Sequence, residues 1–442
     1  MNSNKFIDKD KIRNNFATLA LKLDKQRHIS SIKEGFMLAI PATIIGGIFL
    51  ILAQPPVDPS RIAPTNIFFQ FLLAWKAWAV KNTAILMLPY NLTMGLLGIY
   101  AVIGISYSLA KKCQLDPINS AISSLIVFLV VSVTYKDGNI VTTNLGSVGI
   151  FSAIIIGLLT TEIAKFLKDK NVMIRLPEQV PPMVAAPFEL LIPLGVNVAL
   201  FMSINGLLSL GGTSIPNLVA TIIRPLLVAS GSLWMILFFT FLARFLWFFG
   251  IHGDSVVNSV LTPIVMANLT QNAAAIAAGQ KPSAIFAGYF INIFGAWCML
   301  PALVLALLIF SKSVHLKTLV KLALIPDIFN INEPSTFGIP IVANMNLVVP
   351  YILIPMVNVS IAYFATLAGL IGKFYIQSPF TTPAIIGAFL GTMDWKASVL
   401  YALLFVLDFL IWIPFIKNYD NILLERESNN AVSNKTIDIV SE

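Results

Sequence analysis

Charged residues are scarce in this chain of 442 residues. Asp, Glu, Lys and Arg make up 11% of it, whereas 57% of its residues are hydrophobic, and soluble domains carry roughly 25% charged residues. This scarcity excludes an ordinary soluble enzyme and indicates a polytopic membrane protein. The net charge of +8 comes mostly from Lys and Arg in connectors and at the termini, so we expect no nucleic-acid partner.

Cysteine is almost absent. Cys113 and Cys298 are the only two, and they cannot build a disulfide framework or a metal site. We therefore expect neither a metal nor a cofactor. We also expect no removable signal peptide, because residues 1–34 contain no apolar core followed by a small-residue cleavage site.

Long apolar runs with few or no charges fill the rest of the sequence. Divided by length and turn residues, they predict an all-α membrane fold with ten transmembrane helices: 35–54, 83–110, 118–135, 147–164, 186–210, 228–249, 255–277, 283–310, 347–371 and 397–416. The helix 255–277 is the most polar, and an amphipathic helix is its alternative. Segments 325–346 and 378–393 are broken by Pro and Gly, and we predict two re-entrant hairpins there.

The charge pattern predicts the orientation and the division of the chain. Segments on the side of the N-terminus carry 20 Lys and Arg against 8 on the opposite side, which favours both termini in the cytosol. Residues 1–34 should form a cytosolic amphipathic segment on the membrane lipid, and 417–442 a disordered cytosolic tail. Between them we expect an N-terminal membrane half, 35–215, and a C-terminal half, 216–416.

Glu333 is the main candidate for chemistry. In this orientation the two hairpins enter from opposite sides, so their tips should meet, as broken segments do around the central site of alternating-access transporters. A carboxylate in such a segment is costly unless it has polar partners. The alternative is a surface loop with a solvated Glu.

His252 is the second candidate, since Gly250 and Gly253 flank it and its imidazole can donate, accept or carry a proton near neutrality. A structural loop histidine is the alternative. Phe380, Thr381 and Thr382 offer an aromatic ring and two hydroxyls to a sugar, or else form a turn that caps a short helix. Glu189 is either a second polar contact or an interfacial residue.

These residues, except Glu189, lie in motifs that resemble the membrane C component of the phosphotransferase system, in its lactose, cellobiose and chitobiose family. The matching motifs run along nearly the whole chain: Gln26-Arg27-His28, Gly35-Phe36, Val180-Pro181-Pro182, Gly250-Ile251-His252-Gly253, Asn332-Glu333-Pro334, Phe337-Gly338-Ile339-Pro340 and Pro379-Phe380-Thr381-Thr382-Pro383. Phe380 departs from the pattern, because a tryptophan is common there.

The resemblance implies ten spans, two hairpins, a homodimer formed through the N-terminal half and a disaccharide site in the C-terminal half, in a bacterial plasma membrane. It also implies that the sugar 6-hydroxyl attacks a phosphocysteine on a separate cytosolic B component, which an A component serves. Glu333 and His252 would contact the reacting hydroxyl, with Asn332 beside them. Whether Glu333 or His252 acts as the general base stays open.

Two other functions are compatible with a carboxylate in a broken helix. A proton-coupled sugar symporter would use Glu333 and His252 as a relay and accumulate unmodified sugar. A membrane receptor or scaffold would bind sugar without moving it.

Overall fold

The computed structural model describes residues 26–55, 57, 59, 65–136, 138–177, 179–339, 341 and 344–440. The predicted amphipathic segment up to residue 25 lies outside them. The described chain is mostly helical, which confirms the predicted fold class.

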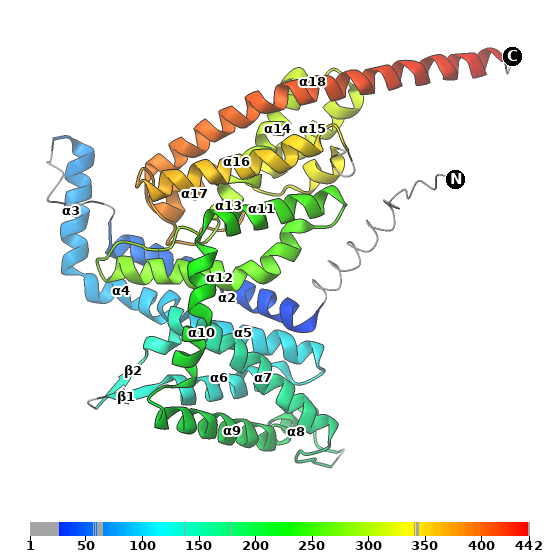
Figure 1. Cartoon of the computed structure of the whole chain (residues 1–442). Helices are drawn as coiled ribbons and strands as arrows, with labels where there is room; N and C mark the ends of the chain where they lie inside the picture. The colour runs from blue at the N-terminus through cyan, green and yellow to red at the C-terminus, as the bar shows by residue number, and fades with distance from the viewer. Residues whose placement is uncertain are drawn as a thin grey trace, which may run out of the picture.

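The N-terminal part of the chain forms the middle and lower part of Figure 1, apart from α3, which stands off it. Its elements are α2 (Arg27–Ala53), α3 (Ile67–Lys81), α4 (Thr83–Leu92), α5 (Leu97–Lys112), α6 (Pro117–Ser132), strands β1 (Thr134–Lys136) and β2 (Asn139–Val141), α7 (Ile150–Asp169), α8 (Pro182–Glu189) and α9 (Leu191–Leu210). The two strands form an antiparallel hairpin.

The remaining helices form the centre and the upper part of Figure 1. They are α10 (Ile215–Ser230), α11 (Leu233–Phe248), α12 (Gly253–Ala277), α13 (Phe290–Phe294), α14 (Ala296–Phe310), α15 (Val314–Ile328), α16 (Val348–Leu367), α17 (Ala384–Thr392) and α18 (Trp395–Val440).

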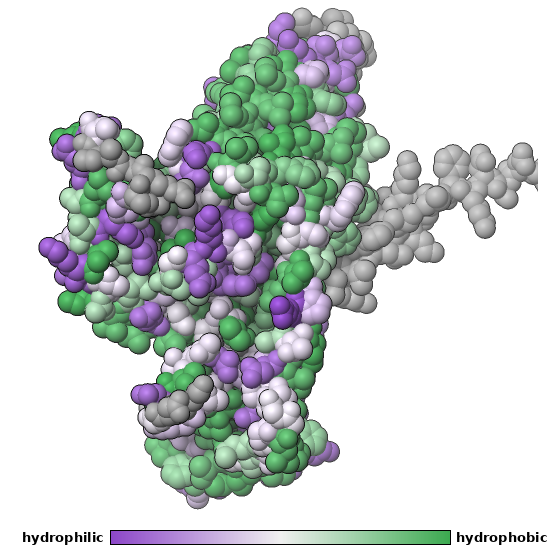
Figure 2. All heavy atoms as spheres, turned by 60° about the vertical axis from the view of Figure 1, so that its left-hand side comes forward, coloured by the Kyte–Doolittle hydropathy of each residue, from purple (hydrophilic) through white to green (hydrophobic). Residues whose placement is uncertain are grey.

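All ten predicted spans correspond to apolar helices. Among the described residues, eight helices are long and apolar enough to cross a membrane, and α10 with α11 make one further, bent pair. The tenth is the shorter apolar helix α6. In Figure 2, hydrophobic residues cover most of the upper part of the molecule, as expected for a surface that faces lipid.

Two predicted boundaries near the N-terminus are wrong. The first helix begins at Arg27 rather than at residue 35, because the Gln26 side chain accepts a hydrogen bond from the Ile29 amide at 2.7 Å and caps it. The predicted connector 55–82 contains helix α3, of which only Ala79 is buried.

The sixth predicted span is bent. The axes of α10 and α11 meet at 77°, with Gly231 between them and Ser232 capping α11. Residues 215–227, expected in a connector, belong to α10, since Ser214 caps this helix and Pro216 occupies its first turn. Figure 1 shows α10 crossing between the lower and upper parts of the molecule.

Helix α12 supports the irregular chain that precedes α13. The predicted span 283–310 is helical only from Phe290. Asn272 of α12 donates to the carbonyls of Ala284 (2.7 Å) and Phe374 (2.8 Å) and accepts from the amides of Ser283 (3.1 Å) and Ala284 (2.9 Å). These bonds satisfy backbone that lipid would leave unpaired, so the polar residue Asn272 has a structural role.

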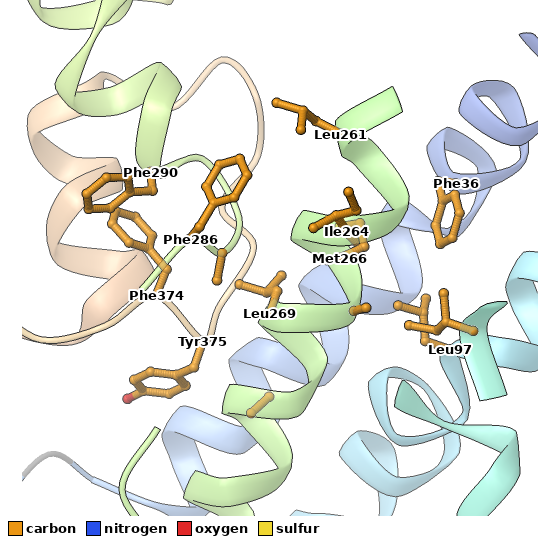
Figure 3. Close-up of a cluster of buried hydrophobic side chains, with 14 of the residues drawn as sticks. Phe36, Leu97, Leu261, Ile264, Met266, Leu269, Phe286, Phe290, Phe374 and Tyr375 are labelled. Carbon is orange, nitrogen blue, oxygen red and sulfur yellow. The ribbon is translucent and has the colours of Figure 1, made fainter. Parts of the chain in front are cut away.

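Helix α12 also lies between the two parts of the chain. In Figure 3, Leu269 points toward Phe286 and Tyr375, while Phe36 of α2 and Leu97 of α5 lie on the opposite side of the same helix. These residues belong to one buried apolar cluster. The core is therefore continuous from α5 to the segment around Phe374.

Helices α2 and α5 cross at two glycines. A Cβ on Gly104 would lie 2.5 Å from the carbonyl oxygen of Gly35, and one on Gly35 would lie 2.5 Å from Ile105. The two backbones therefore touch, as in membrane helix pairs joined through small residues.

The polar tail continues α18 to Val440 rather than being disordered. Asp420 of this helix accepts hydrogen bonds from the Ser311 hydroxyl (2.6 Å) and from the Lys312 (2.8 Å) and Ser313 (3.0 Å) amides. Helix α18 is thus fixed to the connection that leads from α14 into α15.

Candidate functional site

The first broken segment turns back on itself after α15. Asn330 adopts a left-handed conformation with φ of 65°, which asparagine tolerates better than most residues. Asp327 then accepts a hydrogen bond from the Ser335 hydroxyl across the turn. Residues Pro334–Gly338 form one π-helical turn, and this carries Glu333 at its start.

The two broken segments meet, as predicted. Nδ2 of Asn330 donates to the carbonyl oxygens of Phe380 and Thr382, both at 2.7 Å. The Thr382 amide donates to the Pro379 carbonyl at 3.0 Å, so the second segment begins with a turn before α17. The ring of Phe380 packs edge-on against Trp297, with the centroids 5.3 Å apart.

Glu333 and His252 face each other across these segments. Nε2 of His252 lies 3.4 Å from Oε1 of Glu333, and both side chains are about half exposed. Nδ1 of His252 accepts the Ser255 amide at 3.1 Å and caps α12. A neutral ring therefore carries its proton on Nε2, where it can donate to Glu333 or to a ligand.

An ion pair between the buried Arg244 and the partly exposed Asp254 holds this end of α12 in place. Arg244 is buried, pairs with Asp254, and donates to the Tyr351 hydroxyl at 3.3 Å. The Trp247 indole N–H donates to the other Asp254 oxygen at 2.8 Å. The Trp247 ring lies 4.4 Å from that of His252, so a rigid platform supports the imidazole.

A cavity of about 250 Å³ opens beside this platform. Asp254 lines it near the His252 end of α12, and Phe380 and Trp297 contribute aromatic surface. Its other polar lining residues come from several elements: Lys33, Asn258, Thr262, Tyr289, Asn292 and Gln377. Oε1 of Gln377 is buried without a hydrogen-bond partner among the described residues, and such an acceptor calls for a donor.

Of the other predicted residues, Asn332 and Thr381 lie next to this group and Glu189 does not. Asn332 adjoins Glu333, and its buried Oδ1 has no partner in the described chain. Thr381 is exposed beside Phe380. Glu189 lies apart from this group, in a small depression lined by Asp116 and Lys168.

Neither cysteine is placed as a nucleophile. Cys113 and Cys298 are both free and buried. Burial raises the pKa of the Cys113 thiol, and the nearby Glu162 carboxylate acts in the same direction. A raised pKa reduces the thiolate form that reacts. In the part of the chain that is described, no cluster of His, Cys, Asp and Glu could hold a metal ion.

Sequence reasoning missed Trp247, Asn292, Gln377 and Tyr289. Arg244, which belongs to the same platform as Trp247, did leave a signal in the sequence. It is a cation inside an apolar run, with Asp254 ten residues later. Trp247 lies close to His252 in the sequence but has no distinctive spacing. Asn292, Gln377 and Tyr289 come from elements that are far from His252 in the sequence.

Comparisons with known proteins decide the family. A family model described as "Phosphotransferase system, EIIC" matches residues 33–355. The chain belongs to this EIIC family. EIIC proteins are membrane transporters, so the chain is a multi-pass membrane protein, and the predicted resemblance is confirmed.

Similar EIIC proteins cover nearly the whole chain. The oligo-beta-mannoside-specific EIIC component of Bacillus subtilis (strain 168) is 32% identical over 438 residues, 96% of either chain. The cellobiose-specific EIIC component of Geobacillus stearothermophilus is 32% identical and covers 91% of this chain and 92% of its own. The lactose-specific EIICB component of Lacticaseibacillus casei is 32% identical over 95% of this chain and 71% of its own.

A solved EIIC structure has the same fold. The crystal structure of the transporter ChbC, the IIC component from the N,N'-diacetylchitobiose-specific phosphotransferase system, matches with a TM-score of 0.83 at 33% identity. The match covers 95% of this chain and 99% of that one.

Proposed function

We propose that this EIIC protein moves a β-linked disaccharide of the cellobiose, lactose or chitobiose type inward while its 6-hydroxyl is phosphorylated. The observation that carries the proposal is the His252–Glu333 pair, 3.4 Å apart, beside a mostly apolar cavity whose walls also carry aromatic rings and several polar groups. The names of the relatives agree, since they include oligo-beta-mannoside, cellobiose and lactose systems.

In this proposal the sugar lies in the cavity with one ring against Phe380. A sugar hydroxyl donates to the unpaired Oε1 of Gln377, and Asn332 and Thr381 contact the ring nearest Glu333. Glu189 lies apart from the cavity. In this proposal it is a polar residue at the membrane interface and does not contact the sugar.

Glu333 is the general base of the proposed reaction. Nδ1 of His252 is occupied by the Ser255 amide, so a neutral His252 presents N–H rather than a lone pair and orients the hydroxyl or the phosphoryl group. Glu333 accepts the proton of the 6-hydroxyl as its oxygen attacks phosphorus, and the sulfur–phosphorus bond of the phosphocysteine breaks to release a thiolate.

The phosphocysteine belongs to a partner in this scheme. Cys113 and Cys298 are buried, so a cytosolic B component, itself served by an A component, supplies the phosphoryl group. We place the protein in a bacterial plasma membrane with both termini cytosolic, because Lys and Arg concentrate on that side. We also divide it into membrane halves 35–215 and 216–416, with the sugar site in the second.

The decisive experiment is uptake of radiolabelled cellobiose, lactose and chitobiose into vesicles, with and without phosphorylated B component. The native chain should produce sugar phosphate only when the B component is present. Glu333→Gln should lower that rate at least ~100-fold, in line with the loss of a general base. Glu425→Gln, an exposed residue of α18, is the matched control and should leave the rate unchanged.

Accumulation of free sugar without a B component, abolished by an uncoupler, would refute phosphorylation and support the symporter. Saturable binding with no uptake under either condition would instead support the receptor. A native rate retained by Glu333→Gln would remove Glu333 from the chemistry.

A further inference from the structure

Asn330 is the point at which one side chain joins the two broken segments. Its two donated hydrogen bonds, to the carbonyls of Phe380 and Thr382, are both 2.7 Å long and bridge 50 and 52 residues of sequence. Asn330 is buried, so water does not compete for these bonds, and a low local dielectric strengthens them.

The backbone around Asn330 is fixed from its own side. The main-chain N–H of Asn330 donates to the Asp327 carbonyl at 3.1 Å. The Asp327 side chain accepts a hydrogen bond from Ser335, beyond the turn. The left-handed conformation at φ 65° favours Asn or Gly. Of these two residues, only Asn supplies an amide group that donates twice.

The acceptors of these bonds are equally constrained. The Phe380 and Thr382 carbonyls lie in the turn closed by the Thr382 amide and the Pro379 carbonyl. The Phe380 ring extends from this turn, packs on Trp297 and lines the cavity. The position of the ring therefore depends on where Asn330 holds the turn.

We propose that Asn330 is a positioning residue, a clasp between the two segments. It holds Phe380 of the second segment at a fixed place relative to Glu333, which follows Asn330 by three residues in the first segment. The inference rests on the proposed function, because it concerns how that sugar site is assembled. Asn330 itself touches neither the sugar nor the phosphoryl group; it acts through Phe380 and the turn.

The first test is direct sugar binding by calorimetry in detergent, using whichever of cellobiose, lactose and chitobiose the native chain binds most tightly. Asn330→Gly keeps the left-handed backbone and removes both donors, and the Kd should rise about tenfold, the effect of losing one or two net hydrogen bonds. Asn171→Gly is the control, because Asn171 is also left-handed, at φ 59°, but lies in the connection after α7. Its Kd should match the native value.

A double-mutant cycle separates positioning from general loosening. In a Phe380→Ala chain the ring that the clasp positions is gone, so adding Asn330→Gly should change Kd less than about threefold. A tenfold rise in both backgrounds would overturn the proposal, as would an unchanged Kd for Asn330→Gly alone.

Asn330→Asp provides the same test if the glycine variant fails to fold. An ionised carboxylate cannot donate to the two carbonyls, so sugar binding should be weak at neutral pH. It should partly recover at low pH, where the protonated carboxyl donates one bond, relative to the native chain at the same pH. Equal pH profiles for the variant and the native chain would contradict the clasp.

Binding needs no B component. A native chain that binds sugar, and loses affinity in Asn330→Gly, but never yields sugar phosphate would refute the proposed function while leaving the clasp intact. Normal phosphorylation and normal binding in the Asn330 variants would refute the clasp alone.

Discussion

Single side chains in this protein satisfy backbone that lipid cannot. Asn272 forms four hydrogen bonds to segments before α13 and before α17, and Asn330 joins the two hairpins in the same way. Both are asparagines, which combine two donors with an acceptor on a short stem. These asparagines therefore serve to hydrogen-bond non-helical backbone and do not indicate a surface exposed to water.

Asn272→Ala should therefore destabilise the protein strongly. The main-chain groups that it bonds lose their partner, and the free energy of unfolding should fall by about 3 kcal/mol, a sum of the usual net values of such bonds. Unfolding followed in SDS-containing mixed micelles measures this change. Gln271→Ala is the control, since Gln271 is exposed on the same helix; an equal loss in both variants would contradict a specific role for Asn272.

At the scale of elements, the closest contact between two helices depends on glycines, which have no side chain at the crossing point. Gly35 and Gly104 let α2 and α5 touch through their backbones, whereas a Cβ on Gly195 or Gly206 of α9 would meet no heavy atom within 4 Å. Within one copy of the chain, the first pair is a packing requirement and the second is not.

Gly104→Ala should lower the free energy of unfolding by about 2 kcal/mol, because a methyl group 2.5 Å from a backbone oxygen forces the helices apart. Gly206→Ala should be neutral or slightly stabilising, since alanine favours helix. Thermal unfolding in detergent of the two single variants compares them directly. A stable Gly104→Ala chain would show that the crossing can relax.

The elements were also the part of the molecule that the sequence predicted best. All ten apolar runs correspond to helices, and Glu333 was expected as a candidate because a polar group stands out against lipid. That His252 acts together with Glu333 was implied by the family resemblance. The bend between α10 and α11, the irregular chain before α13 and the Trp247 platform could not be predicted. The irregular chain is bonded to Asn272, which also donates to Phe374, far away in the sequence. The bend at Gly231 and the contacts of Trp247 with Asp254 and His252 are local, but apolar periodicity carries no record of either kind.

At the scale of the whole molecule, the apolar surface bears on assembly. Helix α9 has few buried residues, with Leu207 and Leu210 among its exposed side chains. We propose that the N-terminal half, including this face, forms the interface of a homodimer.

Cysteine cross-linking in membranes checks the dimer. Leu207→Cys should give a disulfide-linked dimer on mild oxidation, since both native cysteines are buried and should not contribute. Leu410→Cys, exposed on α18 in the other half, is the control and should remain monomeric. Cross-linking at Leu410 alone would place the interface on the C-terminal half.

The length of α18 has a mechanical consequence. Its 46 residues extend about 69 Å at 1.5 Å per residue, more than twice the roughly 30 Å of hydrocarbon that a span must cross. The part of α18 that is not needed to cross the bilayer therefore extends beyond it. Asp420 attaches this part to the connection before α15. A protein that bound the far end of α18 would act at a distance from the bilayer, and the bonds of Asp420 would pass its effect to the connection that leads into α15.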